Sequence, residues 1–262
     1  MSSSQFLRTP SLSDGDVDTK RVEIAAYFNA TWEQYESLFE TLVDDSAYYE
    51  KPIPLRHPLI FYYGHTATFF VNKLILTGLI EHRINPEFES MFAIGVDEMS
   101  WDDLDETHYD WPSVSEVTDY RRQVKELVNN LIKLAPLTFP VDWENPWWII
   151  LMGIEHEQIH LETSSVLIRQ QKLEYLTTHP SWEPCRTTGT APENEMISVS
   201  AGQVTIGKTY DSPYYGWDNE YGSHSSEVDL FEAGRYLVSN QEFLAFVDAG
   251  GYQQDSYWNE EG

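Results

Sequence analysis

Two histidines four residues apart, His156 and His160, are the residues of this chain best suited to chemistry. Positions i and i+4 share one face of a helix, so both imidazoles can bind the same metal ion. The segment from His156 to His160 also matches H-E-x-x-H, the motif of zinc peptidases, in which Glu157 would be the general base. The motif alone therefore leaves two kinds of metalloenzyme open.

The residues around the pair predict a helix over 147–170. Apolar side chains recur there at helical intervals, and Asn145-Pro146 supplies a start signal. Glu162 follows His160 by two positions, about 200° round the helix, so it is a poor ligand from this segment. The alternative to a metal site is that His156 and His160 are ordinary core or surface histidines. It is less favoured here, because two imidazoles beside glutamates in an apolar helix are costly to bury without a purpose.

A metal site needs a third ligand. The metzincin pattern is absent, since residues 161–166 read Leu-Glu-Thr-Ser-Ser-Val. In a gluzincin the third ligand could be Glu174 or Glu183, but neither lies in a supporting local pattern. The better candidate is His65, on a predicted helix over 59–80. A single histidine on such a helix is more often a hydrogen-bonded core residue than a metal ligand. The assignment of His65 therefore depends on His156 and His160 lying on a neighbouring helix. His65, Asn72 and Lys73 would interrupt a membrane span, which favours a buried bundle helix.

Composition limits the function classes. The 262 residues carry a formal charge of −27, which disfavours nucleic acid and anionic membrane surfaces as partners. The single cysteine, Cys185, excludes an internal disulfide framework and is interpreted as an incidental loop thiol. The polar N-terminus has no apolar signal core, so a cytoplasmic, reducing location is expected.

Helical periodicity in the first two thirds of the chain predicts a four-helix bundle over 19–176. A mobile acidic tail over 1–18 is expected to precede it. The connectors 44–57 and 82–113 are too rich in Pro, Asp and Trp to continue helices. The predicted helices span about 20–43, 59–80, 115–134 and 147–170.

The pattern changes after Leu176. Residues 177–195, with three prolines and runs of Thr and Glu, are interpreted as a linker. A second domain over 196–262 is predicted from short β segments and one helix. The β segments lie at 197–199, 203–207 and 227–231, and the helix at 239–248.

Three motifs together resemble the non-haem iron sulfoxide synthases of thiol-histidine biosynthesis: 64–70 (Gly-His-Thr-Ala-Thr-Phe-Phe), 156–169 (His-Glu-Gln-Ile-His-Leu-Glu-Thr-Ser-Ser-Val-Leu-Ile-Arg) and 217–220 (Trp-Asp-Asn-Glu). That family joins a DinB-like four-helix bundle to a formylglycine-generating-enzyme-like, C-type-lectin-like domain. The resemblance thus implies an α+β fold class. The continuation 162–169 and the segment 96–104 are most similar to the branch that makes 5-histidylcysteine sulfoxide for ovothiol.

The resemblance implies that His65, His156 and His160 bind Fe(II), with O2 as co-substrate and L-cysteine and L-histidine as the molecules joined. Three neutral imidazoles would leave open positions on iron for thiolate, imidazole and O2. Arg121 and Arg122, on the third predicted helix, are candidate anchors for a substrate carboxylate. The alternative for this arginine pair is a solvated helix face.

The chain departs from the family pattern by ending at Gly262, so residues 196–262 are expected to be an incomplete second domain and the chain alone a poor catalyst. The family's catalytic tyrosine and the methyltransferase domain of longer ovothiol enzymes would lie beyond that residue. Three alternatives stay open. They are an ergothioneine-type synthase acting on trimethylhistidine (hercynine), a zinc peptidase, and a non-catalytic DinB-like binding module.

Overall fold

The computed structural model describes residues 8–93, 109–183, 186 and 188–260. The chain divides into two compact units. The first comprises Met1–Glu183 with Asp211–Asp218, and the second comprises Pro184–Tyr210 with Asn219–Gly262. The division after Glu183 falls inside the predicted linker 177–195, whereas Asp211–Asp218, expected in the second domain, groups with the first unit.

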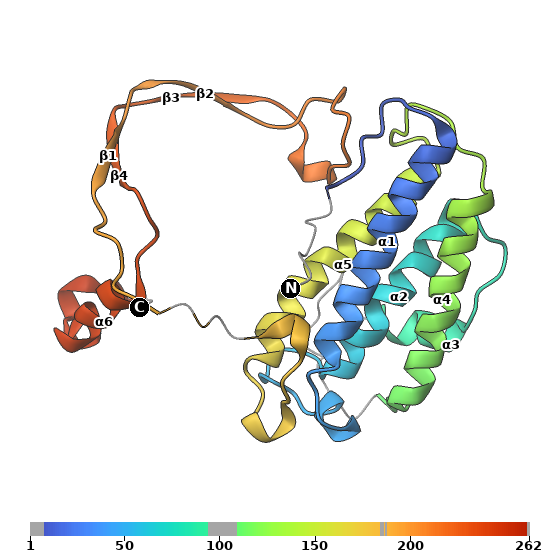
Figure 1. Cartoon of the computed structure of the whole chain (residues 1–262), viewed down its shortest axis with the longest axis horizontal. Helices are drawn as coiled ribbons and strands as arrows, with labels where there is room; N and C mark the ends of the chain where they lie inside the picture. The colour runs from blue at the N-terminus through green and yellow to red at the C-terminus, as the bar shows by residue number, and fades with distance from the viewer. Residues whose placement is uncertain (1–7, 94–108, 184–185, 187, 261–262) are drawn as a thin grey trace. The chain divides into compact units, whose positions relative to one another are not determined.

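Four long helices form the first unit. They lie side by side (Figure 1). They confirm the predicted helical bundle, with ends that differ from the predicted ones by a few residues. The helices are α1 (Val17–Phe39), α2 (Leu59–Leu76), α4 (Val114–Leu134) and α5 (Trp147–Ile168). Short 3₁₀ turns follow α1 at Asp45–Tyr48 and follow α5 at Leu173–Tyr175 and Pro180–Trp182.

The bundle is built around a large aromatic core. Phe28, Trp32 and Phe70 are completely buried and pack ring to ring, with centroids 5.4–6.1 Å apart. Gly153 on α5 lets Phe70 approach, because a Cβ atom there would lie 2.2 Å from the ring. Close packing of this kind holds α2 and α5 at a fixed separation, and the chemistry described below depends on that separation.

The connector 82–113 was expected not to continue the helix before it, and α2 does end at Leu76, but the connector holds a short helix of its own. Helix α3 spans Pro86–Met91, and Asn85 caps it by accepting from the backbone N–H groups of Glu87 and Phe88. Proline at the first position of a helix needs no N–H partner, so Asn85-Pro86 starts the helix. The segment 96–104, used in the family resemblance, lies outside the described residues.

Residues 8–16, expected to belong to a mobile tail, run along the bundle. Leu12 is only 2% exposed. Its N–H donates to the carbonyl of Pro213 at 2.6 Å, and its carbonyl accepts from the N–H of Val141 at 2.9 Å. The segment Asp211–Asp218 is held to the same unit by Tyr215, whose ring lies 4.8 Å from that of Trp148.

The second unit consists of two antiparallel strand pairs and one helix. Strand β1 (Met196–Val199) pairs with β4 (Phe231–Gly234), and β2 (Gly202–Ile206) pairs with β3 (His224–Val228). Helix α6 (Asn240–Asp248) begins with a capping box between Ser239 and Glu242. The predicted strand 227–231 is in fact the end of β3 and the start of β4, because residues 229 and 230 belong to neither strand. The mixture of helices and strands confirms the predicted α+β class.

Within the described residues, no helix combines the length and the apolar character needed to cross a membrane.

Candidate metal centre

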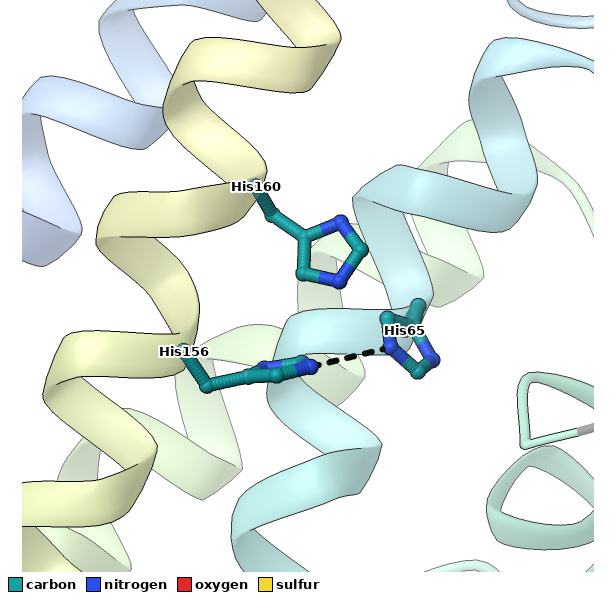
Figure 2. A group of neighbouring side chains, drawn as sticks. All are labelled: His65, His156 and His160. Carbon is teal, nitrogen blue, oxygen red and sulfur yellow. Dashed lines mark hydrogen bonds between the residues drawn. The ribbon is translucent and has the colours of Figure 1, made fainter. Parts of the chain in front are cut away.

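The three predicted histidines meet between α2 and α5. Figure 2 shows His156 and His160 projecting from α5 toward His65 on α2. Each histidine offers one ring nitrogen, and the three nitrogens lie within 4.8 Å of one another. The spacing of four residues on α5 places two imidazoles on one face of that helix, and packing against α2 adds the third.

His65 is oriented by a backbone carbonyl. Its Nδ1 lies 2.6 Å from the oxygen of Phe92, which can only accept, so Nδ1 carries the proton and Nε2 presents a lone pair to the cluster. Phe92 can approach because the preceding residue of α2 is Gly64, where a Cβ atom would meet the Phe92 ring at 2.7 Å. Gly64 therefore matters through the contact that orients His65.

The spacing of the ring nitrogens in the cluster fits a metal ion. Nε2 of His65 and Nε2 of His156 are 3.2 Å apart. Two nitrogens about 2.1 Å from one ion, at angles of about 90–110°, would be separated by about 3.0–3.4 Å. A third ring nitrogen, from His160, lies within 4.8 Å of the other two. Three imidazoles at this spacing are a donor set that fits a bound cation.

Burial keeps two of the imidazoles neutral. Burial, together with the neighbouring histidines, lowers the pKa of His156 well below its usual value. The same causes, burial first and His65 second, lower the pKa of His160 to about 3. The ring of Phe69 stacks on His156 at 3.7 Å and fixes its plane. Neutral, fixed imidazoles are the form that binds a metal ion.

A buried ion pair lies directly behind the histidines. Arg121, from α4, is completely buried, and its Nη2 donates to Oε1 of Glu157 at 3.0 Å. Its Nη1 donates to Oγ1 of Thr66 at 2.8 Å. Thr66 and Glu157 are the chain neighbours of His65 and His156, so this guanidinium links the two ligand-bearing helices at the level of the site.

The structure does not bring the two predicted substrate arginines to the cluster. Arg121 also bonds to Glu36 at 3.2 Å and to the carbonyl of Tyr63 at 2.9 Å, which commits its guanidinium to the protein interior. Arg122 is exposed and pairs with Asp119 and Glu126 on its own helix. These contacts favour the alternative weighed from the sequence for Arg122, a solvated helix face, and a structural role for Arg121.

Glu157 and Glu162 take no place among the ligand atoms. The carboxylate of Glu157 is completely buried and bound to Arg121 and Thr66. Burial raises the pKa of Glu157, and the charge of Arg121 acts against that rise. A peptidase base must instead reach water on the metal, so the arrangement disfavours the peptidase interpretation. Glu162 is exposed, as its helical position predicted.

Three contributors to the site were missed from the sequence. Phe92 orients His65, Thr66 joins the ion pair, and Phe69 stacks on His156. Thr66 and Phe69 lie within the motif 64–70 quoted above, one and four residues after the predicted ligand His65. Phe92 could have been suspected only through the start signal at Asn85-Pro86, which places a short helix before it.

Comparison with known protein families agrees with this architecture. Residues 27–164 match the DinB superfamily, and residues 183–262 match the sulfatase-modifying factor enzyme 1-like domain. The first match covers more than half of the chain, and the chain therefore belongs to the DinB superfamily. The predicted pairing of a DinB-like bundle with a formylglycine-generating-enzyme-like domain is thereby confirmed.

Several characterised relatives come from ergothioneine biosynthesis. The chain is 26% identical over 238 residues to ergothioneine biosynthesis protein 1 of Neurospora crassa, covering 84% of this chain and 27% of that protein. The Schizosaccharomyces pombe protein of the same name is 24% identical over 79% of this chain and 30% of its own length. Hercynine oxygenase of Mycolicibacterium thermoresistibile is 32% identical over 42% of this chain and 24% of its own length.

The chain is thus homologous to these enzymes of ergothioneine biosynthesis, which supports the predicted sulfoxide synthase family. It spans less than a third of the length of the relatives named here. Their names favour the ergothioneine-type alternative over the ovothiol interpretation.

Proposed function

We propose that this chain carries the Fe(II) centre of an O2-dependent sulfoxide synthase, with His65, His156 and His160 as the ligands. The observation that supports this most is the convergence of three ring nitrogens within 4.8 Å between two rigid helices. Homology to hercynine oxygenase supports oxygen chemistry over peptide hydrolysis. The proposal assigns the centre to a bundle over 19–176, joined by the linker 177–195 to a second domain that starts at 196.

In this proposal the protein residues hold and orient, and the metal supplies the redox chemistry. A bound Fe(II) ion would provide open positions where a thiolate, an imidazole and O2 can meet. Phe92 holds His65 with Nε2 toward the site, and Phe69 restrains the plane of His156. Arg121 keeps α2 and α5 in register behind the ligands. Fixed geometry of this kind reduces the cost of bringing reactants together.

Two imidazole substrates compete within the proposal. The relatives' names favour hercynine, which carries a trimethylammonium group, as the partner of the thiol substrate. The motifs at 96–104 and 162–169 led instead to L-histidine and the product 5-histidylcysteine sulfoxide. Both candidates share the imidazole ring and the carboxylate, so the amine end of the substrate distinguishes them.

Oxygen uptake and product mass test the proposal. An iron-loaded form extended at its C-terminus through the second domain would be given L-cysteine with either hercynine or L-histidine. We expect O2 consumption that requires both substrates, with a product whose mass is that of a thiol–imidazole sulfoxide. Preference for hercynine would establish the ergothioneine type, and preference for L-histidine the ovothiol type. Peptide hydrolysis with zinc, without O2 uptake, would contradict the proposal.

A further inference from the structure

A cavity of about 360 Å³ opens beside His160 within the first unit. Residues of α5, of the N-terminal part of α2 and of the preceding connector line it. They include Ile53, Arg56, Tyr62, His160, Glu162 and Val166. Its size is at the lower end of the range for small-molecule sites. Because one candidate metal ligand forms part of its wall, a molecule held there would adjoin the metal centre.

The cavity contains one cation and one anion that do not neutralise each other. Arg56 is exposed, and its Nη1 donates to the carbonyl of Leu55 at 3.1 Å. Among the described residues it has no carboxylate within 4.0 Å. This is notable in a chain with 43 acidic and 16 basic residues, where most cations can find a carboxylate. Glu162 is likewise exposed and has no ion-pair partner in the described ranges.

Arg56 also acts on the wall nearest the histidines. Arg56 and Tyr62 both line the cavity. Burial raises the pKa of Tyr62, and the positive charge of Arg56 opposes that rise. Tyr62 in turn lies 6.2 Å, ring to ring, from His160. Ile53 and Val166 add apolar side chains to the lining. The cavity therefore combines a cation, an anion, an apolar surface and a metal ligand.

We infer that this cavity binds the head group of an α-amino acid, with Arg56 on the carboxylate and Glu162 on the ammonium group. An α-amino acid carries both charges on one carbon, and each would replace water on an unpaired partner. A guanidinium forms short, charge-assisted bonds to a carboxylate, often two in parallel. The side chain of the amino acid would then extend toward His160. This inference rests on the proposed function, because it supplies a substrate to the same centre.

The test measures binding of L-histidine to the full 262-residue chain, loaded with Fe(II) and kept free of O2, by calorimetry. Histamine lacks the carboxylate and imidazolepropionate lacks the ammonium group, so the three ligands isolate each end. We expect Arg56→Leu to weaken L-histidine by about 10–100-fold and to leave histamine unchanged. Glu162→Gln should weaken L-histidine and histamine but not imidazolepropionate.

Two matched substitutions separate this effect from a general change of charge. Arg122→Leu removes an exposed arginine of α4, and Glu144→Gln removes an exposed glutamate before α5. Both should bind L-histidine as the unaltered chain does. A parallel series with L-cysteine, cysteamine and 3-mercaptopropionate determines whether the thiol substrate uses the cavity. Weaker binding of the amino acid by Arg56→Leu in either series supports the inference.

Equal binding of both amino acids by the unaltered chain and Arg56→Leu would overturn the inference. Iron content measured in the same samples distinguishes failure of the head-group site from failure of the metal centre. Normal iron with Arg56-independent binding would refute the head-group site and leave the metal centre standing. Arg56-dependent binding to a chain that takes up no iron would support the head-group site and refute the metal centre.

Discussion

Ile24 on α1 is completely buried, whereas Ile206 on β2 of the second unit is 65% exposed. The contrast extends over both units. The helical unit surrounds a continuous aromatic core, while every residue of β1 and β2 is exposed, including Val204. A sheet of only two strands cannot bury its apolar side chains unless another element packs against it. The candidate metal ligands therefore lie on the unit that can hold them rigidly without help from the other.

Limited proteolysis should show this contrast most strongly. We expect trypsin to cut after Lys208 and Arg235 at least tenfold faster than after Lys125 on α4, because local opening of weakly packed segments costs little free energy. Mass spectrometry of timed samples measures both rates. Equal rates, or first cleavage within the bundle, would remove the distinction between the two units.

Arg121→Met should destabilise the helical unit by about 3–5 kcal/mol, because it leaves Glu157 buried without its cation. Urea denaturation followed by tryptophan fluorescence measures the free energy of unfolding. Arg122→Met, one position along the same helix, is the control and should change it by less than about 0.5 kcal/mol.

The double variant Arg121→Met/Glu157→Leu sharpens the same comparison. It removes both charges and should recover part of the lost stability. If Arg121→Met cost no more than Arg122→Met, the buried ion pair would not be what holds α2 and α5 together.

Acid should destabilise the metal-free chain through the buried histidines. The pKa of His160 is about 3 in the folded state because of burial, against about 6.5 when unfolded. Between these values the unfolded chain binds a proton that the folded chain excludes, so stability is lost as pH falls below 6.5. The loss is about 2 kcal/mol at pH 5 for this group.

Urea denaturation at pH 7 and pH 5, with chelator present, measures the pH effect. His160→Gln should reduce the difference between the two pH values. His224→Gln, on the exposed strand β3 of the second unit, should leave it unchanged. An unaltered difference in His160→Gln would mean that His160 is accessible to protons in the folded chain.

Helices and ligands could be predicted because both follow from local spacing. The period of apolar residues located α1, α2, α4 and α5, and the i, i+4 pair located the metal-facing side of α5. The fate of the arginines could not be predicted in this way. An amphipathic pattern does not say whether Arg121 meets Glu157 in the core or a ligand in a cavity, since that depends on the packing of three helices.

Long-range contacts also decided what the sequence left open. Leu12 is buried and makes backbone hydrogen bonds to Val141 and Pro213, each more than 100 residues away. The orientation of His65 depends on Phe92, placed by a short helix in a connector whose composition disfavoured helices. Both features need the folded chain to be known before they can be recognised.

The most direct measurement of the central claim is anaerobic Fe(II) binding to the full chain, with metal content determined after gel filtration. We predict about one iron per chain, with affinity reduced at least tenfold by alanine at His65, His156 or His160. Alanine at the exposed His82 should have no effect. Iron binding that survives all three substitutions, or that Glu157→Gln abolishes in their place, would contradict a three-histidine centre.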